Sequence, residues 1–188
     1  MKPLREMTRW DAYFLKICQA VSENSVCYSR QIGAILVRNK SIISTGYNGP
    51  PRAIHHCGMA RINRDPFLRE IFVLHNIDIT VLNTERCPRR IIGHNSGEGL
   101  ELCPAVHAEQ NCIANAAKIG VRTQGTTLYM NDQIPCRICL GMIINAGIVK
   151  VVVTKLEFYD DAGRYIARGS DLKILDYYGK HHEMSLEN

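Results

Sequence analysis

The chain reads HAEQNCIANAAKIGVRTQGTTLYM over residues 107–130 and PCRICLGMIINAGIVKVVVT over residues 135–154. The first half of each stretch contains helix-forming residues and ends near a glycine, whereas the second half has the β-branched residues typical of a strand. The consecutive valines at 151–153 favour a strand that is buried on both faces. The pattern therefore predicts two helix–strand units in succession, which is typical of a sheet covered by helices.

The segments on either side extend this pattern. Apolar residues at helical spacing predict a helix over 10–21, and two strand-like runs flank a turn at 38–40. A short helix is expected at 161–168. The expected strands are 33–37, 41–45, 126–130, 149–154 and 172–176. This order predicts an α/β domain of three α-β-α layers with a mixed five-stranded sheet.

The two quoted stretches also carry metal-binding residue types at their helix starts. His107, Cys136 and Cys139 supply an imidazole and two thiolates, the ligands that zinc prefers. Pro135 suits a helix start because its missing N–H would be unpaired there in any case. The partial positive charge of a helix N-terminus also favours thiolates over thiols. Three protein ligands leave one position open for water, which is the arrangement of a catalytic zinc site.

Glu109 stands two residues after His107 and is not required to hold the metal. A carboxylate at that place can take a proton from the metal's water and deliver it to a substrate. His-x-Glu followed by Pro-Cys-x-x-Cys is the pattern of zinc deaminases that act on nucleobases. The alternative is a structural zinc knuckle, but such a site normally uses four protein ligands and the two motifs supply three.

Composition sets the broad class of the protein. At 188 residues the chain is expected to form one domain, and its net charge of +5 suits an anionic substrate or no charged partner equally. No apolar run approaches the ~20 residues that span a bilayer, and the N-terminal residues lack the apolar segment of a signal peptide. We therefore expect a cytoplasmic protein without a membrane partner, in which cysteines bind metal rather than form disulfides.

Six cysteines remain outside the first metal motif. Cys18 and Cys112 lie in helical apolar patterns and are expected in the core. The other four are scattered without a Cys-x-x-Cys pair: Cys27, Cys57, Cys87 and Cys103. They suggest a second, closed tetrahedral site; a histidine ligand or no second site at all are the alternatives. The candidate histidines are His55, His56 and His94.

Residues 58–98 are expected to form an inserted substructure, since an unstructured loop of that length is unusual in a compact domain. The run 67–74 fits a helix or a strand, and 77–82 alternates like a strand. The insert could cover the site or form a subunit contact. Residues after about 176 read as a short polar tail.

Beyond the zinc motifs, four segments carry a resemblance to a known family: 29–34 (SRQIGA), 42–51 (IISTGYNGPP), 56–57 (HC) and 103–111 (CPAVHAEQN). Over residues 8–176, except 58–86, the chain resembles the deoxycytidylate (dCMP) deaminases of the cytidine deaminase-like superfamily. The resemblance implies the cytidine deaminase-like fold and a zinc-dependent hydrolase of pyrimidine deoxyribonucleotide metabolism. Its expected reaction converts dCMP to dUMP and ammonia, which feeds dTMP synthesis.

The resemblance also implies a role for individual residues. His107, Cys136 and Cys139 would bind the catalytic zinc, with Glu109 as the proton shuttle. The expected contacts with the substrate are the Ala108 N–H and the Ile134 carbonyl with the pyrimidine, Asn48 with the deoxyribose, and Arg30 and Tyr159 with the phosphate. Arg30 could instead bind a nucleotide effector or be an ordinary surface charge.

The resemblance also bears on the four scattered cysteines. Related sequences carry cysteines at places that match Cys27, Cys57, Cys87 and Cys103, which implies a structural zinc; His94 is a possible substitute for Cys87. It further implies a homohexamer, allosterically activated by dCTP and inhibited by dTTP.

Two residues depart from the family's usual pattern. Ile134 stands where Ser or Glu is common, so only its carbonyl would serve the substrate. Cys112 replaces a usual alanine and is a candidate for oxidation.

Two rival functions follow from the same residues. One is another deaminase of this fold, acting on cytidine or on adenosine in tRNA. The chain has no evident cluster of Lys and Arg for a polynucleotide, so we expect none as partner. The other is a non-catalytic zinc-binding module, which would have no use for Glu109.

Overall fold

The computed structural model describes residues 7–78, 86–95 and 97–180. The chain divides into two compact units, which are described here one at a time. The first contains the residues up to 25, 32–47 and those from 107 onward; the second contains 26–31 and 48–106. The second unit thus begins and ends outside the insert expected at 58–98.

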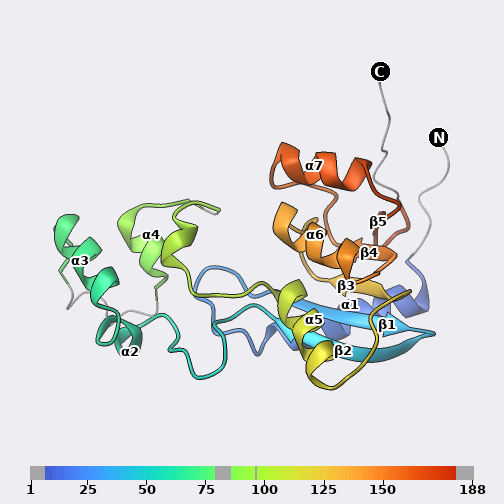
Figure 1. Cartoon of the computed structure of the whole chain (residues 1–188), viewed down its shortest axis with the longest axis horizontal. Coiled ribbons are helices and arrows are strands. Elements are labelled where there is room, and N and C mark those ends of the chain that lie inside the picture. The colour runs from blue at the N-terminus through green and yellow to red at the C-terminus, as the bar shows by residue number, and fades with distance from the viewer. Residues whose placement is uncertain (1–6, 79–85, 96, 181–188) are drawn as a thin grey trace. The chain divides into compact units, whose positions relative to one another are not determined.

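The first unit is built on a five-stranded sheet with the order β2-β1-β3-β4-β5 (Figure 1). β1 runs antiparallel to both β2 and β3, and β3, β4 and β5 are parallel to one another. The strands are β1 (Gly33–Arg38), β2 (Ser41–Tyr47), β3 (Thr127–Met130), β4 (Lys150–Val153) and β5 (Lys173–Asp176). The prediction of an α/β fold with a mixed five-stranded sheet is confirmed, because each of the five strands expected for this sheet is present within a few residues of its expected ends.

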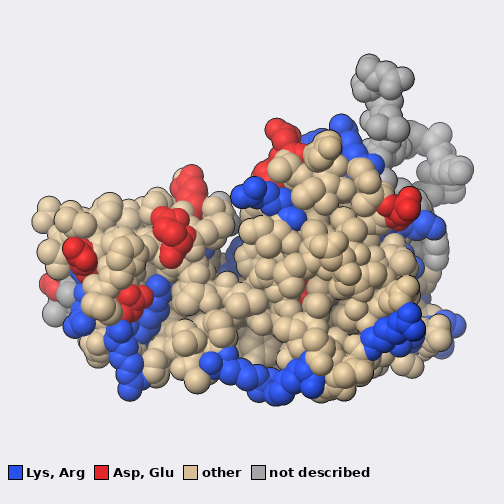
Figure 2. Space-filling view, in the orientation of Figure 1, with Lys and Arg blue, Asp and Glu red and all other residues tan. Residues whose placement is uncertain are grey.

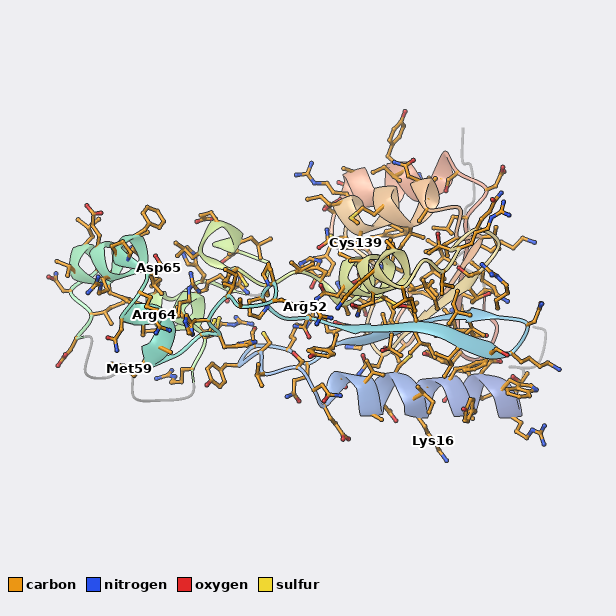
Figure 3. All side chains as sticks on the ribbon, turned by 60° about the horizontal axis from the view of Figure 1, so that its bottom comes forward. Lys16, Arg52, Met59, Arg64, Asp65 and Cys139 are labelled. Atoms are coloured by element: carbon orange, nitrogen blue, oxygen red, sulfur yellow. The ribbon has the colours of Figure 1, made fainter. Side chains whose placement is uncertain are left out.

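Helices cover both faces of this sheet. The helices of the first unit are α1 (Arg9–Ser22), α5 (Ala108–Lys118), α6 (Arg137–Asn145) and α7 (Asp161–Arg168). Figure 3 shows α1, with its labelled Lys16, on one side of the sheet, and the labelled Cys139 of α6 on the other.

The alternation of side chains along the strands produces two separate cores. Ile35, Val37 and Tyr129 pack with Phe14 and Cys18 of α1. The residues between them face the other way and pack against α5, α6 and α7: Ala34, Leu36, Leu128 and Met130. The sheet is therefore buried on both faces, in agreement with the valine run of β4.

The β1–β2 hairpin is closed by Asn39 and Lys40, which have φ values of 48° and 64°. Positive φ at both central residues is the geometry of the turns that match the twist of antiparallel strands. This hairpin places β2 at an edge of the sheet, beside α5.

The second unit contains short helices around a small apolar core of Ile62, Leu68 and Phe72. Its elements are α2 (Met59–Ile62), α3 (Pro66–Leu74), α4 (Pro88–Ile92) and the 3₁₀ helix η2 (Leu100–Leu102). The ambiguous run at 67–74 is helical: Asp65 caps α3 by accepting a hydrogen bond from the Leu68 N–H at 3.0 Å, and Pro66 occupies the first turn. Of the strand expected at 77–82, residues 79–82 lie outside the described residues, and 77 and 78 are not in a strand.

Among the described residues, no helix is both long enough and apolar enough to cross a membrane.

Candidate metal centre

The N-termini of α5 and α6 carry the two zinc motifs. His107 is the N-cap residue of α5, and its backbone N–H donates to the Gln110 side chain at 3.1 Å. Cys136 is the N-cap of α6, which places Pro135 just before the helix rather than in its first turn. Cys139 follows in that first turn and is fully buried. Both motifs thus lie where helix dipoles favour negatively charged ligands.

Three donor atoms meet at this place. His107 Nδ1 lies 3.6 Å from Cys136 Sγ and 3.4 Å from Cys139 Sγ. Zinc bonds of about 2.3 Å to sulfur and about 2.0 Å to nitrogen, at tetrahedral angles, separate such atoms by roughly 3.6 Å. The spacing therefore fits a zinc ion without rearrangement. Among the residues that the structure describes, this is the one group of three metal-binding side chains with donor atoms within 4.8 Å of each other.

Hydrogen bonds within the trio favour a thiolate. The pKa of Cys136 is lowered to about 4, first by a hydrogen bond with Cys139 and then, against the effect of burial, by one with His107. The same contacts raise the pKa of Cys139 and the pKa of His107. Zinc binds the deprotonated forms of these side chains, so its binding at such a site releases the protons that they hold.

Glu109 lies beside the trio and is buried, with 4% of its surface exposed. Burial raises the pKa of its carboxyl, because a charged carboxylate loses solvation in the interior; a hydrogen bond to its own backbone and the positive charge of His107 act the other way. A buried carboxyl with a raised pKa can hold a proton close to neutral pH, which is the property of a general acid–base residue.

The remaining predicted residues of the first unit lie in different settings. Ala108 and Ile134 are fully buried, whereas Tyr159 is exposed in the segment between β4 and α7. Cys112, expected as a candidate for oxidation, is fully buried and burial raises the pKa of its thiol to about 12. The expectation is wrong on this point, since a buried, protonated thiol is a poor nucleophile.

Arg30 and Asn48 belong to the second unit. Asn48 is buried, and its Nδ2 donates to the Arg30 carbonyl at 2.8 Å. The asparagine amide thus ties two segments that are distant in sequence, 26–31 and the start of 48–106. An antiparallel bridge between Gly49 and Val106 closes the same region.

The four scattered cysteines and His94 also lie in the second unit. Burial raises the pKa of Cys57, and the charges of Cys87 and Cys103 add to this effect, so three of the four thiols share one neighbourhood. In the described residues, however, no set of three has its donor atoms within 4.8 Å, apart from the trio of the first unit. His94 lies against Gly99, where an added Cβ would meet its ring at 2.6 Å.

Sequence reasoning missed Arg61, which is 9% exposed and lies beside these thiols. Its Nη1 lies 3.8 Å from Cys57 Sγ, its Nη2 donates to the Leu102 carbonyl at 2.6 Å, and it pairs with Asp65 at 3.1 Å. The spacing of four between Arg61 and Asp65 was the available signal for the ion pair. No sequence pattern indicated the contact between Arg61 and Cys57, because it depends on the rotamers of the two side chains.

A family model described as the cytidine and deoxycytidylate deaminase zinc-binding region matches residues 8–155. The chain belongs to this family. The match spans both zinc motifs, and a zinc-binding family agrees with the donor set of His107, Cys136 and Cys139. The predicted membership in the cytidine deaminase-like superfamily is confirmed.

Individual proteins similar to this chain include several deoxycytidylate deaminases. A deoxycytidylate deaminase of Mycobacterium phage D29 is 30% identical over 151 residues, which cover 78% of this chain and 94% of that protein. One from Schizosaccharomyces pombe is 29% identical over 152 residues, or 81% of this chain, yet the match spans only 39% of that protein's length. The crystal structure of dCMP deaminase from cyanophage S-TIM5, in complex with dCMP and dUMP, superposes with a TM-score of 0.59 at 23% identity, covering 94% of this chain and 98% of that one. This last likeness supports the fold.

Proposed function

We propose that this protein is a zinc-dependent hydrolase that converts dCMP to dUMP and ammonia. The observation that carries the proposal is the spacing of His107 Nδ1 from the two cysteine sulfurs, 3.6 and 3.4 Å, beside the buried carboxyl of Glu109. Three ligands and a separate acid–base group make up a catalytic site, whereas a structural site would use a fourth side chain as ligand. Family membership and the deoxycytidylate deaminases among its relatives support dCMP as the substrate.

Bound zinc would lower the pKa of water from about 15.7 to about 7, so that water attacks at neutral pH. Glu109 accepts the proton that this water loses and passes it to the pyrimidine ring nitrogen. A new C–O bond forms at C4 of the base as the ring accepts the proton. Glu109 then carries the proton of the new C4 hydroxyl group to the amino group; the C–N bond breaks, ammonia leaves, and C4 becomes the carbonyl of dUMP. The raised pKa of Glu109 suits a group that both takes and gives a proton.

The substrate contacts are part of the same proposal. The Ala108 N–H would donate to the pyrimidine and the Ile134 carbonyl would accept from its amino group. Asn48 would bind the deoxyribose, while Arg30 and Tyr159 would bind the phosphate, for which a guanidinium fork is well suited.

An assay of ammonia release with dCMP, CMP, deoxycytidine and adenosine tests this assignment. We expect dCMP to give the highest kcat/KM. A faster reaction with deoxycytidine would contradict the phosphate contacts, and a faster reaction with adenosine would point to an adenosine deaminase of the same fold. On the face drawn in Figure 2, Lys and Arg lie in separate groups divided by other residues.

We also propose that Cys27, Cys57, Cys87 and Cys103 bind a second, structural zinc, with His94 as a possible substitute for Cys87. Four thiolates and Zn²⁺ carry a net charge of −2, so a nearby buried cation would stabilise them. Arg61 meets this need because its guanidinium lies 3.8 Å from Cys57 Sγ.

Zinc content per chain tests the second site. We expect two ions in the parent, one in Cys57→Ser and one in Cys136→Ser. A single ion in the parent, lost on replacing Cys136 but kept on replacing Cys57, would contradict the second site.

Assembly and effectors follow the family resemblance. We propose a homohexamer that dCTP activates and dTTP inhibits. Sedimentation with each nucleotide, combined with the dCMP assay, tests both points; a monomer that ignores both nucleotides would contradict them.

A further inference from the structure

α5 lies closely over the edge strand β2 in the first unit (Figure 1). Its sheet-facing residues are small: Ala108, Cys112 and Ala116 are fully buried at a spacing of four. His107 is the N-cap of α5 and Glu109 lies in its first turn, so the distance of this helix from the strand determines where both side chains lie.

Gly46 determines how near the two elements come. A Cβ added to Gly46 would lie 2.2 Å from the Cys112 nitrogen and 2.5 Å from the Ala108 carbonyl oxygen. Both are backbone atoms, which cannot turn away as a side chain can. Since real Cβ atoms essentially never come within 3.0 Å, any side chain here would push the helix outward by nearly 1 Å.

Polar contacts on either side of Gly46 hold the helix at that depth. Asn111 Nδ2 donates to the Tyr47 carbonyl at 2.8 Å, and Asn115 Nδ2 donates to the Thr45 carbonyl at 2.8 Å. Ser44 Oγ donates to the Cys112 carbonyl at 2.7 Å. Each of the four consecutive residues 44–47 thus contacts α5. We call these four residues the seat of α5.

The contacts differ in how far they lie from the chemistry. Ala108, which meets Gly46, is the residue between His107 and Glu109, and Asn111 is one helical turn from His107. Asn115 is a full turn further along. We propose that Gly46 and Asn111 are positioning residues, which seat the first turn of α5 so that His107 and Glu109 meet the two cysteines of α6. The kinetic part of this inference rests on the proposed deaminase function.

The variants Asn111→Ala and Asn115→Ala form a matched pair, because each removes a hydrogen bond of 2.8 Å from a half-buried asparagine of α5 to a β2 carbonyl. We expect both to lower Tm by similar amounts. A displacement of about 1 Å can cost roughly 100-fold in rate, so Asn111→Ala should lose about tenfold or more in kcat with little change in KM. Asn115→Ala should keep the kcat of the parent.

A second readout is independent of the substrate. Co²⁺ placed in the metal-depleted protein has visible absorption bands that depend on the geometry of its ligands. We expect these bands to shift in Asn111→Ala and to match the parent in Asn115→Ala. Equal effects in both variants, or unchanged cobalt bands in Asn111→Ala, would overturn the inference. If the parent deaminates none of the four compounds, the proposed function fails, while the cobalt comparison still decides whether the seat positions the metal site.

Gly46→Ala tests the same seat more severely. We expect about 100-fold loss of kcat, since its Cβ would displace the turn that carries Glu109. A Gly46→Ala protein that folds and keeps the parent's kcat and cobalt bands would contradict the role given to Gly46. The asparagine pair decides the proposal if this variant does not fold.

Discussion

The ionisable side chains of the first unit differ in pKa because they differ in burial and in their hydrogen-bond partners. Glu109 is buried beside a metal-binding trio, and its raised pKa allows it to carry a proton. Cys112, on the same helix, is also buried, but its thiol meets the Ser44 hydroxyl and the core. Cys136 is only half-buried, and hydrogen bonds from its neighbours favour the thiolate. A cysteine at a helix start thus has a favoured thiolate, whereas a cysteine in the centre of a helix is a protonated core residue.

Thiol labelling tests this contrast. In the metal-depleted protein at pH 8, we expect iodoacetamide to modify Cys136 rapidly, because its pKa is lowered to about 4. Cys112 should remain unlabelled until the protein is unfolded in guanidinium, because its pKa is raised to about 12 and the side chain is inaccessible. Peptide mass spectrometry measures both rates. Labelling of Cys112 in the native protein as fast as that of Cys136 would refute this description of the two cysteines.

The candidate metal centre is built on two helix starts. His107 and Cys136 are the N-cap residues of α5 and α6, so the proposed ligands also occupy capping positions. α7, which covers α6, is capped differently: Asp160 Oδ1 accepts a hydrogen bond from the Gly163 N–H at 2.6 Å. This contact closes the first turn of α7 against α6.

Replacing Asp160 should therefore weaken the fold. We expect Asp160→Ala to lower the free energy of unfolding by about 1 kcal/mol, the usual effect of losing an N-cap side chain. Asp161→Ala is the matched control, because the Asp161 carboxylate is exposed and its pair with Arg164 spans 3.8 Å. It should leave stability unchanged within error. Urea unfolding measures the free energy of unfolding of both variants. Equal losses would mean that the hydrogen bond of Asp160 to the Gly163 N–H adds no more stability than the loss of any carboxylate at this helix start removes.

At the scale of elements, local pattern predicted most of the first unit. The helix at 108–118 and the strands around it were expected because apolar periodicity and glycine stops agree there. Residues 67–74 could not be assigned, since a short, mostly apolar run fits either structure until the cap at Asp65 is considered. The ligand trio was predictable from spacing. The seat at 44–47 was not, because it depends on where α5 comes to lie on a strand about sixty residues earlier.

At the scale of the whole chain, buried acids make stability depend on pH. Cys18 and Cys112 have pKa values raised to about 12 by burial, and burial likewise raises the pKa of Tyr129 to about 12. Each group is neutral in the fold and ionises more easily once unfolded. Their contribution to stability is therefore complete below about pH 9 and is lost as pH rises toward 12.

We expect the free energy of unfolding to fall above pH 9 by roughly 1.4 kcal/mol per pH unit for each such thiol. Cys18→Ala should be less stable at pH 7, because it leaves a cavity, but should show a shallower fall between pH 9 and 11. Urea unfolding under reducing conditions gives both slopes. A flat profile in the parent up to pH 11 would be inconsistent with these pKa shifts.

The central claim is that three side chains hold zinc with one position open while Glu109 moves the protons. Glu109→Gln tests it most directly, because an amide fits the same buried place but cannot accept the proton. We predict that the variant keeps its zinc and its Tm, and that its rate of ammonia release from dCMP falls by about 10²–10⁴-fold. Deamination at the parent's rate would contradict the claim, and loss of the ion from the His107, Cys136 and Cys139 site would mean that Glu109 is a fourth ligand.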